Sequence, residues 1–255
     1  MRHVIIGSGS TGQVTGEFLE AHGEDVIYHD IDYDVVDSLK SVGKKATEVL
    51  PSSWDIAWVC VSQDDLSKAI PPRPSDDSTI VIRSNVSPDV FERLDVGYIL
   101  HMCIYNIEFN ILDNVFYPPR IVIGGVHDSV HSERLLSFMS DIIPNVPIFV
   151  VPQRISSMIS IISDAWFSTQ TSFWNEVYLM LSSDEKYRQC VSSIITTDKR
   201  ISKHGSTMIG MPYLKKTQCD NIDRIIDLCG SPNLFESVKN TNNKIISKKS
   251  NIKQK

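Results

Sequence analysis

The chain has 255 residues, of which 42% are hydrophobic and 22% charged, so it is long enough for one or two domains with real cores and is not a disordered chain. No run approaches the roughly 18 apolar residues of a membrane span, and the first residues are typical of a strand, not of an export signal. We therefore expect a cytoplasmic protein without membrane attachment. The five cysteines have no CxxC or Cys/His spacing, so the sequence predicts neither a disulfide framework nor a metal site.

The formal net charge of −6 is unevenly distributed along the chain. Six of the 25 basic residues and no acidic residue lie in 239–255, which leaves 19 basic against 31 acidic residues in 1–238. An acidic body of this kind repels a phosphate backbone, so binding to nucleic acid is not expected. Residues 236–255 are rich in Lys and Asn and have no helical or strand periodicity, and we expect a flexible tail there.

The amino-terminal residues have the order of a dinucleotide-binding unit. An apolar run, residues 3–6, is followed by the glycine turn Gly-Ser-Gly-Ser-Thr-Gly, a helix-compatible stretch over 13–22 and a second apolar run over 25–30. A strand, a glycine turn, a helix and a strand that ends in an acid are the context that the dinucleotide fingerprint requires. The alternative, that the glycines only make a tight strand-to-helix turn, stays open at this point.

Each position of the glycine turn has a physical role in this interpretation. Gly7 permits the tight turn, Gly9 lets a pyrophosphate approach the backbone, and Gly12 lets the helix and the strand pack closely. Ser10 and Thr11 open the helix, whose unpaired N–H groups and positive dipole end attract the pyrophosphate.

Asp30 stands 18 residues after Gly12, at the end of the second apolar run. Its carboxylate is placed to accept hydrogen bonds from the adenosine ribose hydroxyls, and its charge repels a 2′-phosphate. The predicted cofactor is therefore NAD rather than NADP.

Further apolar runs alternate with helix-length segments as far as residue 152. The apolar runs are 56–61, 79–82, 97–100, 120–124 and 146–152, and the helical segments are 33–42, 88–94 and 131–143. Repeated βα units of this kind predict an α/β fold with a parallel, Rossmann-type sheet over 1–150. Such a sheet binds its ligand at the carboxyl ends of the strands.

The pattern then changes to helix. Residues 155–182 contain no Gly or Pro, and apolar side chains recur at helical spacing, which predicts one helix of roughly 42 Å. Helical segments over 184–197 and 220–228 complete a smaller all-helical domain over 151–235.

The long helix over 155–182 exceeds what a small domain needs for its own packing. The aromatic residues Trp166, Phe167, Phe173 and Trp174 lie on it. We therefore expect part of this helix to meet its counterpart in a homodimer.

Six segments beyond the glycine turn resemble the UDP-glucose/GDP-mannose dehydrogenase family, in the right order between about residues 3 and 226. They are IVIRSNVSP (80–88), NIEF (106–109), PPRIVIG (118–124), TSFWNE (171–176), DKRI (198–201) and GMPYLKKTQCDNI (210–222). This family oxidises the 6-alcohol of a nucleotide sugar to a carboxylate with two NAD. The resemblance implies its fold and activity here, with the nicotinamide near Val61 and Ser84. It also implies a third domain of about a hundred residues that binds the nucleotide of the substrate, and this sequence does not contain it.

The resemblance implies catalytic positions at which this sequence differs. The family's cysteine, whose thiolate forms a thiohemiacetal, is replaced by Thr217, and a threonine hydroxyl stays un-ionised at neutral pH. A register shift that presents Cys219 instead stays open. The carboxylate four residues after that cysteine is replaced by Asn221. Without the thiolate we expect a two-electron oxidation, not the complete four-electron reaction.

Other polar positions of the family differ as well. The lysine and asparagine of its central helix are replaced by Ser160 and Asp164, and the threonine of its KST turn by Asn85, so the cation that would stabilise an alkoxide is missing. Glu108 remains as a candidate for proton handling, and Asp164 is a second candidate base, with Ser160 and Thr217 as hydrogen-bond partners of the substrate. The alternatives are an exposed loop acid for Glu108 and a capped or solvent-facing acid for Asp164.

Three functions stay open from the sequence. The first is an NAD-dependent oxidoreductase that acts on a CH–OH group of a small molecule, with a nucleotide sugar as the expected substrate. The second is an inactive NAD-binding pseudoenzyme whose helical domain is a protein interface. The third, a 6-phosphogluconate or hydroxyacid dehydrogenase type, shares the glycine turn but expects a catalytic lysine where Ser160 stands.

Overall fold

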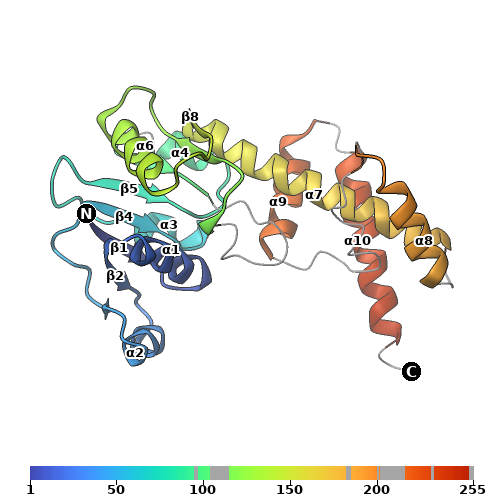
Figure 1. Ribbon diagram of the computed structural model, residues 1–255, viewed down its shortest axis with the longest axis horizontal. Helices are drawn as coiled ribbons and strands as arrows, with labels where there is room; N and C mark the ends of the chain where they lie inside the picture. The colour runs from blue at the N-terminus through green and yellow to red at the C-terminus, as the bar shows by residue number, and fades with distance from the viewer. Residues whose placement is uncertain are drawn as a thin grey trace. The chain divides into compact units, whose positions relative to one another are not determined.

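The computed structural model describes residues 1–94, 97–103, 115–181, 185–199, 201, 216–230 and 233–252 (Figure 1). The chain forms two compact units, unit 1 (Met1–Ser160) and unit 2 (Ile161–Lys255). The division lies inside helix α7 (Gln153–Leu181), ten residues beyond the boundary expected from the sequence. Among the described residues, no helix has both the length and the apolar character that crossing a membrane requires.

Unit 1 is built on an eight-stranded sheet with the order β3-β2-β1-β4-β5-β6-β7-β8. The strands are β1 (Arg2–Ile6), β2 (Asp25–His29), β3 (Ala46–Thr47), β4 (Ile56–Val59), β5 (Thr79–Ile82), β6 (Ile99–His101), β7 (Ile121–Gly124) and β8 (Ile148–Val151). The predicted α/β class with a Rossmann-type sheet is confirmed. The sheet is not fully parallel, however, because β6 and β7 pair antiparallel. A short buried apolar run has the same composition in a parallel and in an antiparallel strand, so the sequence pattern does not reveal this exception.

The helices connect and cover the strands. They are α1 (Ser10–Ala21), α2 (Tyr33–Ser41), the 3₁₀ helix η1 (Gln63–Asp65), α3 (Leu66–Ala69), α4 (Val90–Arg93), α6 (Val130–Ile142), α7 (Gln153–Leu181), α8 (Glu185–Ile195), α9 (Lys216–Leu228) and α10 (Asn233–Ile252). The predicted helices over 13–22, 33–42, 131–143 and 155–182 match α1, α2, α6 and α7 within a few residues. The helical spacing of apolar residues over long segments therefore predicts these four helices correctly.

Alternation along the strands divides the core of unit 1 into two layers. Ile5 and Trp58 face α1 and α6, whereas Val4 and Ala57 face α3 and α4. Because side chains on a strand point alternately to the two faces of a sheet, each strand contributes to both layers. The sheet is thereby covered on both faces, as its apolar runs predict, and its carboxyl edge carries the glycine turn (Figure 1).

Residues 236–255, expected as a flexible tail, belong mostly to α10. Val238, Thr241, Asn242 and Ile245 are buried at the spacing i, i+3, i+4 and i+7, the pattern of one helix face. Thr241 Oγ1 donates to Glu176 Oε1 at 2.8 Å. Two of the four buried positions, Thr241 and Asn242, are polar. A search for hydrophobic periodicity therefore does not detect this helix face in the sequence.

An ordinary surface helix buries its apolar face and exposes its polar one, whereas helix α7 buries many polar side chains and exposes several large apolar ones. Its buried polar side chains are Gln153, Ser156, Ser157, Ser160, Asp164, Ser168, Thr171, Ser172 and Asn175. Its exposed apolar side chains, here called the α7 stripe, are Ile155, Met158, Ile162, Trp166, Phe173 and Met180. Of the aromatic residues expected at an interface, Trp166 and Phe173 belong to the stripe, but Trp174 is buried at 2% exposure.

Candidate functional site

The glycine turn between β1 and α1 depends on the absence of two side chains. Gly7 has a φ of +84°, and a Cβ there would lie 2.6 Å from Val61 Cγ1. A Cβ on Gly12 would lie 2.1 Å from the carbonyl oxygen of Gly7. The sequence therefore needs glycine at Gly7 for the backbone conformation and at Gly12 for the close packing of helix on strand.

Gly9 differs from these two glycines. A Cβ on Gly9 would meet no atom within 4 Å, so no packing in unit 1 requires a glycine there. The open space lies directly before the first residues of α1, Ser10 and Thr11, and Gly9 caps this helix without a side-chain hydrogen bond. The first amides of a helix have no acceptor inside it, so this end offers N–H donors to an anion.

A pocket of ≈ 530 Å³ opens beside the turn. Gly7, Gly9, Asp30 and Val61 line it, so residues singled out in three separate parts of the sequence meet at one place. The size lies within the range of small-molecule sites in proteins. Lys68 also lines the pocket. It belongs to no sequence motif, so the sequence analysis did not identify it.

The carboxylate of Asp30 is held at the end of β2 by two backbone amides. Ser8 N–H donates to Oδ2 at 2.7 Å and Asp32 N–H donates to Oδ1 at 3.0 Å. Each carboxylate oxygen retains a further lone pair for a ribose hydroxyl. The residues at this edge therefore fit the adenosine half of NAD: an open glycine for the pyrophosphate, free helix amides, and a fixed acid for the ribose.

Ser84 lies at the carboxyl end of β5, next to Val61. Its hydroxyl donates to the Val61 carbonyl, and its own carbonyl accepts from His101 Nε2 at 3.1 Å. Ser156 Oγ lies 2.9 Å from His101 Nδ1. Since a carbonyl only accepts, Nε2 carries the proton and Nδ1 accepts from Ser156. Burial lowers the pKa of His101 to about 4, so the ring is neutral. Sequence reasoning misses His101, because only the fold brings it to Ser84.

Two residues that depart from the family pattern contact each other in unit 1. Ser160 Oγ donates to Asn85 Oδ1 at 2.6 Å. Ser160 stands at the position of the family's lysine and Asn85 at that of its KST threonine. The two departures are therefore coupled: a short hydroxyl and an amide form a hydrogen bond where the resemblance implies a cation.

A second pair of departures meets in unit 2. Asn221 Nδ2 donates to Asp164 Oδ2 at 2.7 Å, and Arg224 Nη1 donates to Asn221 Oδ1 at 2.8 Å. Asp164 is 5% exposed and Asn221 is fully buried. The resemblance implies an asparagine at 164 and a carboxylate at 221, so the amide and the carboxylate have exchanged places and the pair still holds one of each. Asp164 is thus neither a capping residue nor a solvent-facing acid.

The catalytic roles of all five candidate residues stay predictions, and the side chains of two of them are not described by the structure. Glu108 lies outside the described residues. Thr217 belongs to the first turn of α9, but its side chain lies outside the described part of the chain.

No protein-family model and no curated protein matches this sequence. Among solved structures, the chain is similar to a UDP-glucose dehydrogenase from the hyperthermophilic archaeon Pyrobaculum islandicum, with a TM-score of 0.74 and 21% identity over 95% of this chain and 68% of that one. A UDP-D-ManNAc dehydrogenase from Pyrococcus horikoshii has a TM-score of 0.76 and 15% identity over 96% and 69% of the two chains.

A GDP-mannose dehydrogenase from Pseudomonas aeruginosa has a TM-score of 0.65 and 18% identity, over 97% of this chain and 70% of that one. All three proteins are nucleotide-sugar dehydrogenases by name. At sequence identities this low, the similarity establishes a common fold and not a common activity. The chain therefore has, over nearly its whole length, the fold of the UDP-glucose/GDP-mannose/UDP-ManNAc dehydrogenases.

Proposed function

We propose that the protein is an NAD-dependent oxidoreductase that acts on a CH–OH group of a nucleotide sugar and removes two electrons. The observation that carries the proposal is the pocket at the glycine turn, where Gly7, Gly9 and Asp30 lie together. The N–H groups at the start of α1 bind the pyrophosphate, and Asp30 binds the adenosine ribose. NAD, when bound, supplies the hydride acceptor.

The residues of the chain bind the substrate and move its proton. The buried polar face of α7 supports a substrate site, because Ser168 Oγ and Thr171 Oγ1 have no hydrogen-bond partner among the described residues. Glu108 or Asp164 accepts the alcohol proton, with Ser160, Asn221 and Thr217 as hydrogen-bond partners of the substrate. Thr217 in place of a thiolate limits the reaction to two electrons.

A non-catalytic NAD-binding module is the second candidate. It is favoured by the two hydrogen-bonded pairs Ser160–Asn85 and Asp164–Asn221, in which side chains at substrate-facing positions of the family satisfy each other. In that case the protein binds the cofactor without turnover.

One experiment separates the candidates. Thermal unfolding is measured with NAD, NADH and NADP, and NADH fluorescence is followed after addition of UDP-glucose, GDP-mannose or UDP-N-acetylmannosamine. We expect stabilisation by NAD but not by NADP, and NADH formation with one of the sugars. Stabilisation without turnover identifies the binding module, and no stabilisation by either form of the coenzyme contradicts both.

Gly9→Val tests the turn directly. The new side chain enters open space, so the fold is retained, but it occupies the place of the pyrophosphate and removes the NAD-induced shift. Gly97→Val is the matched control, because Gly97 also has no neighbour within 4 Å of a Cβ and lies outside the pocket. An NAD shift that survives in Gly9→Val shows that the turn does not hold the pyrophosphate.

We also propose that two copies of the chain pair along the α7 stripe. Six large apolar side chains share this stripe, and only three charged residues occur among the 29 residues of α7. Trp166 is 60% exposed and Phe173 56%. A second copy offers the same apolar stripe, so a symmetric contact covers both at once.

A further inference from the structure

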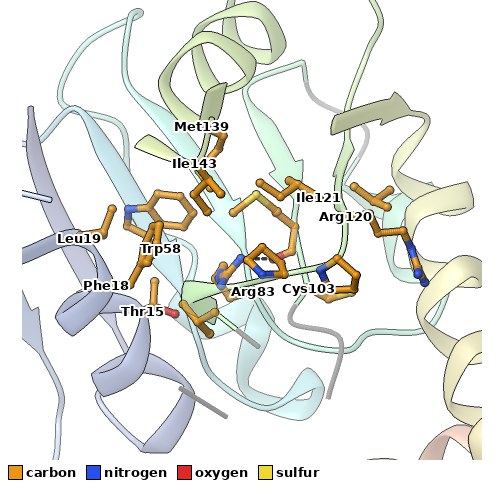
Figure 2. A pocket seen from close by; sticks show the side chains of 15 residues that line it. Thr15, Phe18, Leu19, Trp58, Arg83, Cys103, Arg120, Ile121, Met139 and Ile143 are labelled. Carbon is orange, nitrogen blue, oxygen red and sulfur yellow. Dashed lines mark hydrogen bonds between the residues drawn. The ribbon is translucent and has the colours of Figure 1, made fainter. Parts of the chain in front are cut away.

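A second cavity lies inside unit 1, on the face of the sheet that α1 and α6 cover (Figure 2). Its volume is ≈ 40 Å³, and it shares no lining residue with the pocket at the glycine turn. Most of its wall is apolar: Phe18 and Leu19 come from α1, Trp58 from β4, and Met139 from α6. An apolar cavity of this kind stays dry unless a polar group inside it needs a partner.

Arg83 is that polar group. It directly follows β5 and is only 7% exposed. Nη1 donates to the Met102 carbonyl at 2.8 Å, and the guanidinium carbon lies 5.6 Å from the Trp58 ring centroid. Nε, which is buried, has no hydrogen-bond partner among the residues that the structure describes. Figure 2 shows the Arg83 side chain among the residues that line the cavity.

The described residues of the cavity wall supply no acidic counterpart to the charge of Arg83. Among them, Thr15, the cysteine Cys103 and a second arginine, Arg120, are the other side chains with a polar, ionisable or charged group, and none is an Asp or Glu. A guanidinium keeps its proton in proteins. The Cys60 thiol nearby does not supply a negative charge, because burial raises its pKa to about 12.

An isolated charge in an apolar interior costs several kcal/mol unless an ion or a dipole compensates it. The Met102 carbonyl and the Trp58 ring supply part of that compensation, and a counterion in the cavity would supply the rest. The volume of ≈ 40 Å³ holds on the order of two or three water-sized particles, which excludes a nucleotide, a sugar or a fatty acid.

We propose that this cavity binds one small monovalent anion, of the size of chloride, bromide or nitrate, through the Nε–H group of Arg83. The apolar wall selects anions that lose their hydration shell easily, so bromide and nitrate bind more tightly than fluoride, and a hydrated dianion such as sulfate is excluded. Because α1 and α6 both line the cavity, the bound anion stabilises unit 1 against unfolding.

Thermal unfolding of the full chain, without coenzyme and at constant ionic strength, tests the stabilisation. Sodium gluconate, whose anion is too large for the cavity, is replaced stepwise by sodium chloride, bromide or nitrate. We expect a saturable rise of the melting temperature by roughly 2–4 °C, which arises because the ligand binds only the folded state. A linear or absent response overturns the proposal.

Arg83→Met removes the charge at nearly constant volume and is expected to remove the saturable response. Arg93→Met is the matched control, since Arg93 is exposed on α4 and lies outside this cavity. Loss of the response in both variants contradicts the assignment to Arg83.

Crystals soaked in bromide give a readout that does not depend on a folded variant. The expected result is an anomalous peak within about 3.5 Å of Arg83 Nε in the wild-type protein. A cavity that holds only water, or bromide only at surface positions, overturns the proposal. Neither outcome bears on NAD binding, because the two sites share no residue.

Discussion

The exchange of carboxylate and amide between Asp164 and Asn221 shows how a buried pair constrains its residues. The Asn221 amide joins the carboxyl group of Asp164 to the guanidinium of Arg224 through two hydrogen bonds. Changing one member alone alters the buried charge, whereas exchanging both preserves it. The pair therefore behaves as a unit in which either order of residues satisfies the same hydrogen bonds.

This exchange gives a prediction for a double-mutant cycle. Asn221→Asp places a second carboxylate against Asp164 and lowers the free energy of unfolding by about 2–4 kcal/mol. The double variant D164N/N221D restores most of that loss, because Asp at 221 then faces Arg224 directly. Urea unfolding of the four proteins measures the coupling. Additive effects of the two substitutions would show that the pair is not a unit.

His101 couples the stability of unit 1 to pH. Its folded pKa of about 4 lies below the ordinary value of 6.5, so between these values the unfolded state binds more protons. Stability is complete above pH 6.5 and is lost as the pH falls toward 4, by up to about 3 kcal/mol. Urea unfolding between pH 7 and pH 4 measures it.

The matched variant for this prediction is His101→Gln. Glutamine keeps an N–H donor but does not titrate, so the loss of stability at low pH is expected to be smaller than in the wild type. His3 and several carboxyl groups also have lowered pKa values, so both proteins retain a common part of the pH dependence. Identical pH profiles of the two proteins would exclude His101 as a source.

At the scale of elements, α7 is the segment whose role depends most on its surroundings. Its first two turns belong to unit 1, where Gln153, Ser156, Ser157 and Ser160 each make a side-chain hydrogen bond to the strands or the loops that follow them. Its exposed side carries the six apolar side chains of the α7 stripe. One helix thus combines a largely polar buried face with the exposed α7 stripe. Exposed apolar side chains that cluster in this way are typical of a protein interface.

The proposed pairing along the α7 stripe predicts a dimer. Light scattering at micromolar concentration is expected to give twice the mass of 28.7 kDa. Trp166→Glu places a charge in the middle of the stripe and is expected to give the monomer. Tyr33→Glu, at an aromatic residue outside α7 that is 61% exposed, is expected to leave the dimer intact. A monomeric wild-type protein rejects the proposal.

At the scale of the whole molecule, the chain divides into units of different character. Both large apolar core clusters belong to unit 1, together with the complete sheet and the pocket at the glycine turn. Unit 2 has a smaller core around Ala165, Ile222 and Val238. The proposed cofactor site and most of the apolar stabilisation therefore lie in the first 160 residues.

This division predicts that a fragment of residues 1–160 folds alone and keeps the NAD-induced thermal shift. A fragment of residues 1–150 is expected to melt at a lower temperature, because it lacks the four side chains of α7 that bond to unit 1. Circular dichroism melting curves compare the two. Equal melting temperatures, or the absence of a cooperative transition in the longer fragment, contradict the division at residue 160.

The sequence by itself determined most of the strands and helices of unit 1 and the position of the glycine turn. Apolar runs, their periods and the spacing of Gly7, Gly9, Gly12 and Asp30 are local properties, and local geometry fixes the strands, the helices and the turn that joins them. The α/β class follows from the same patterns.

Only the tertiary structure decided which polar groups meet. The contacts of His101 with Ser84, of Ser160 with Asn85 and of Asp164 with Asn221 join residues 17 to 75 positions apart. It also decided that α10 is a helix with a partly polar buried face, and that Arg83 is buried beside a cavity. The physical reason is that hydrophobic periodicity reports which face is covered, whereas the partner of a buried polar group depends on segments that approach only in the folded chain.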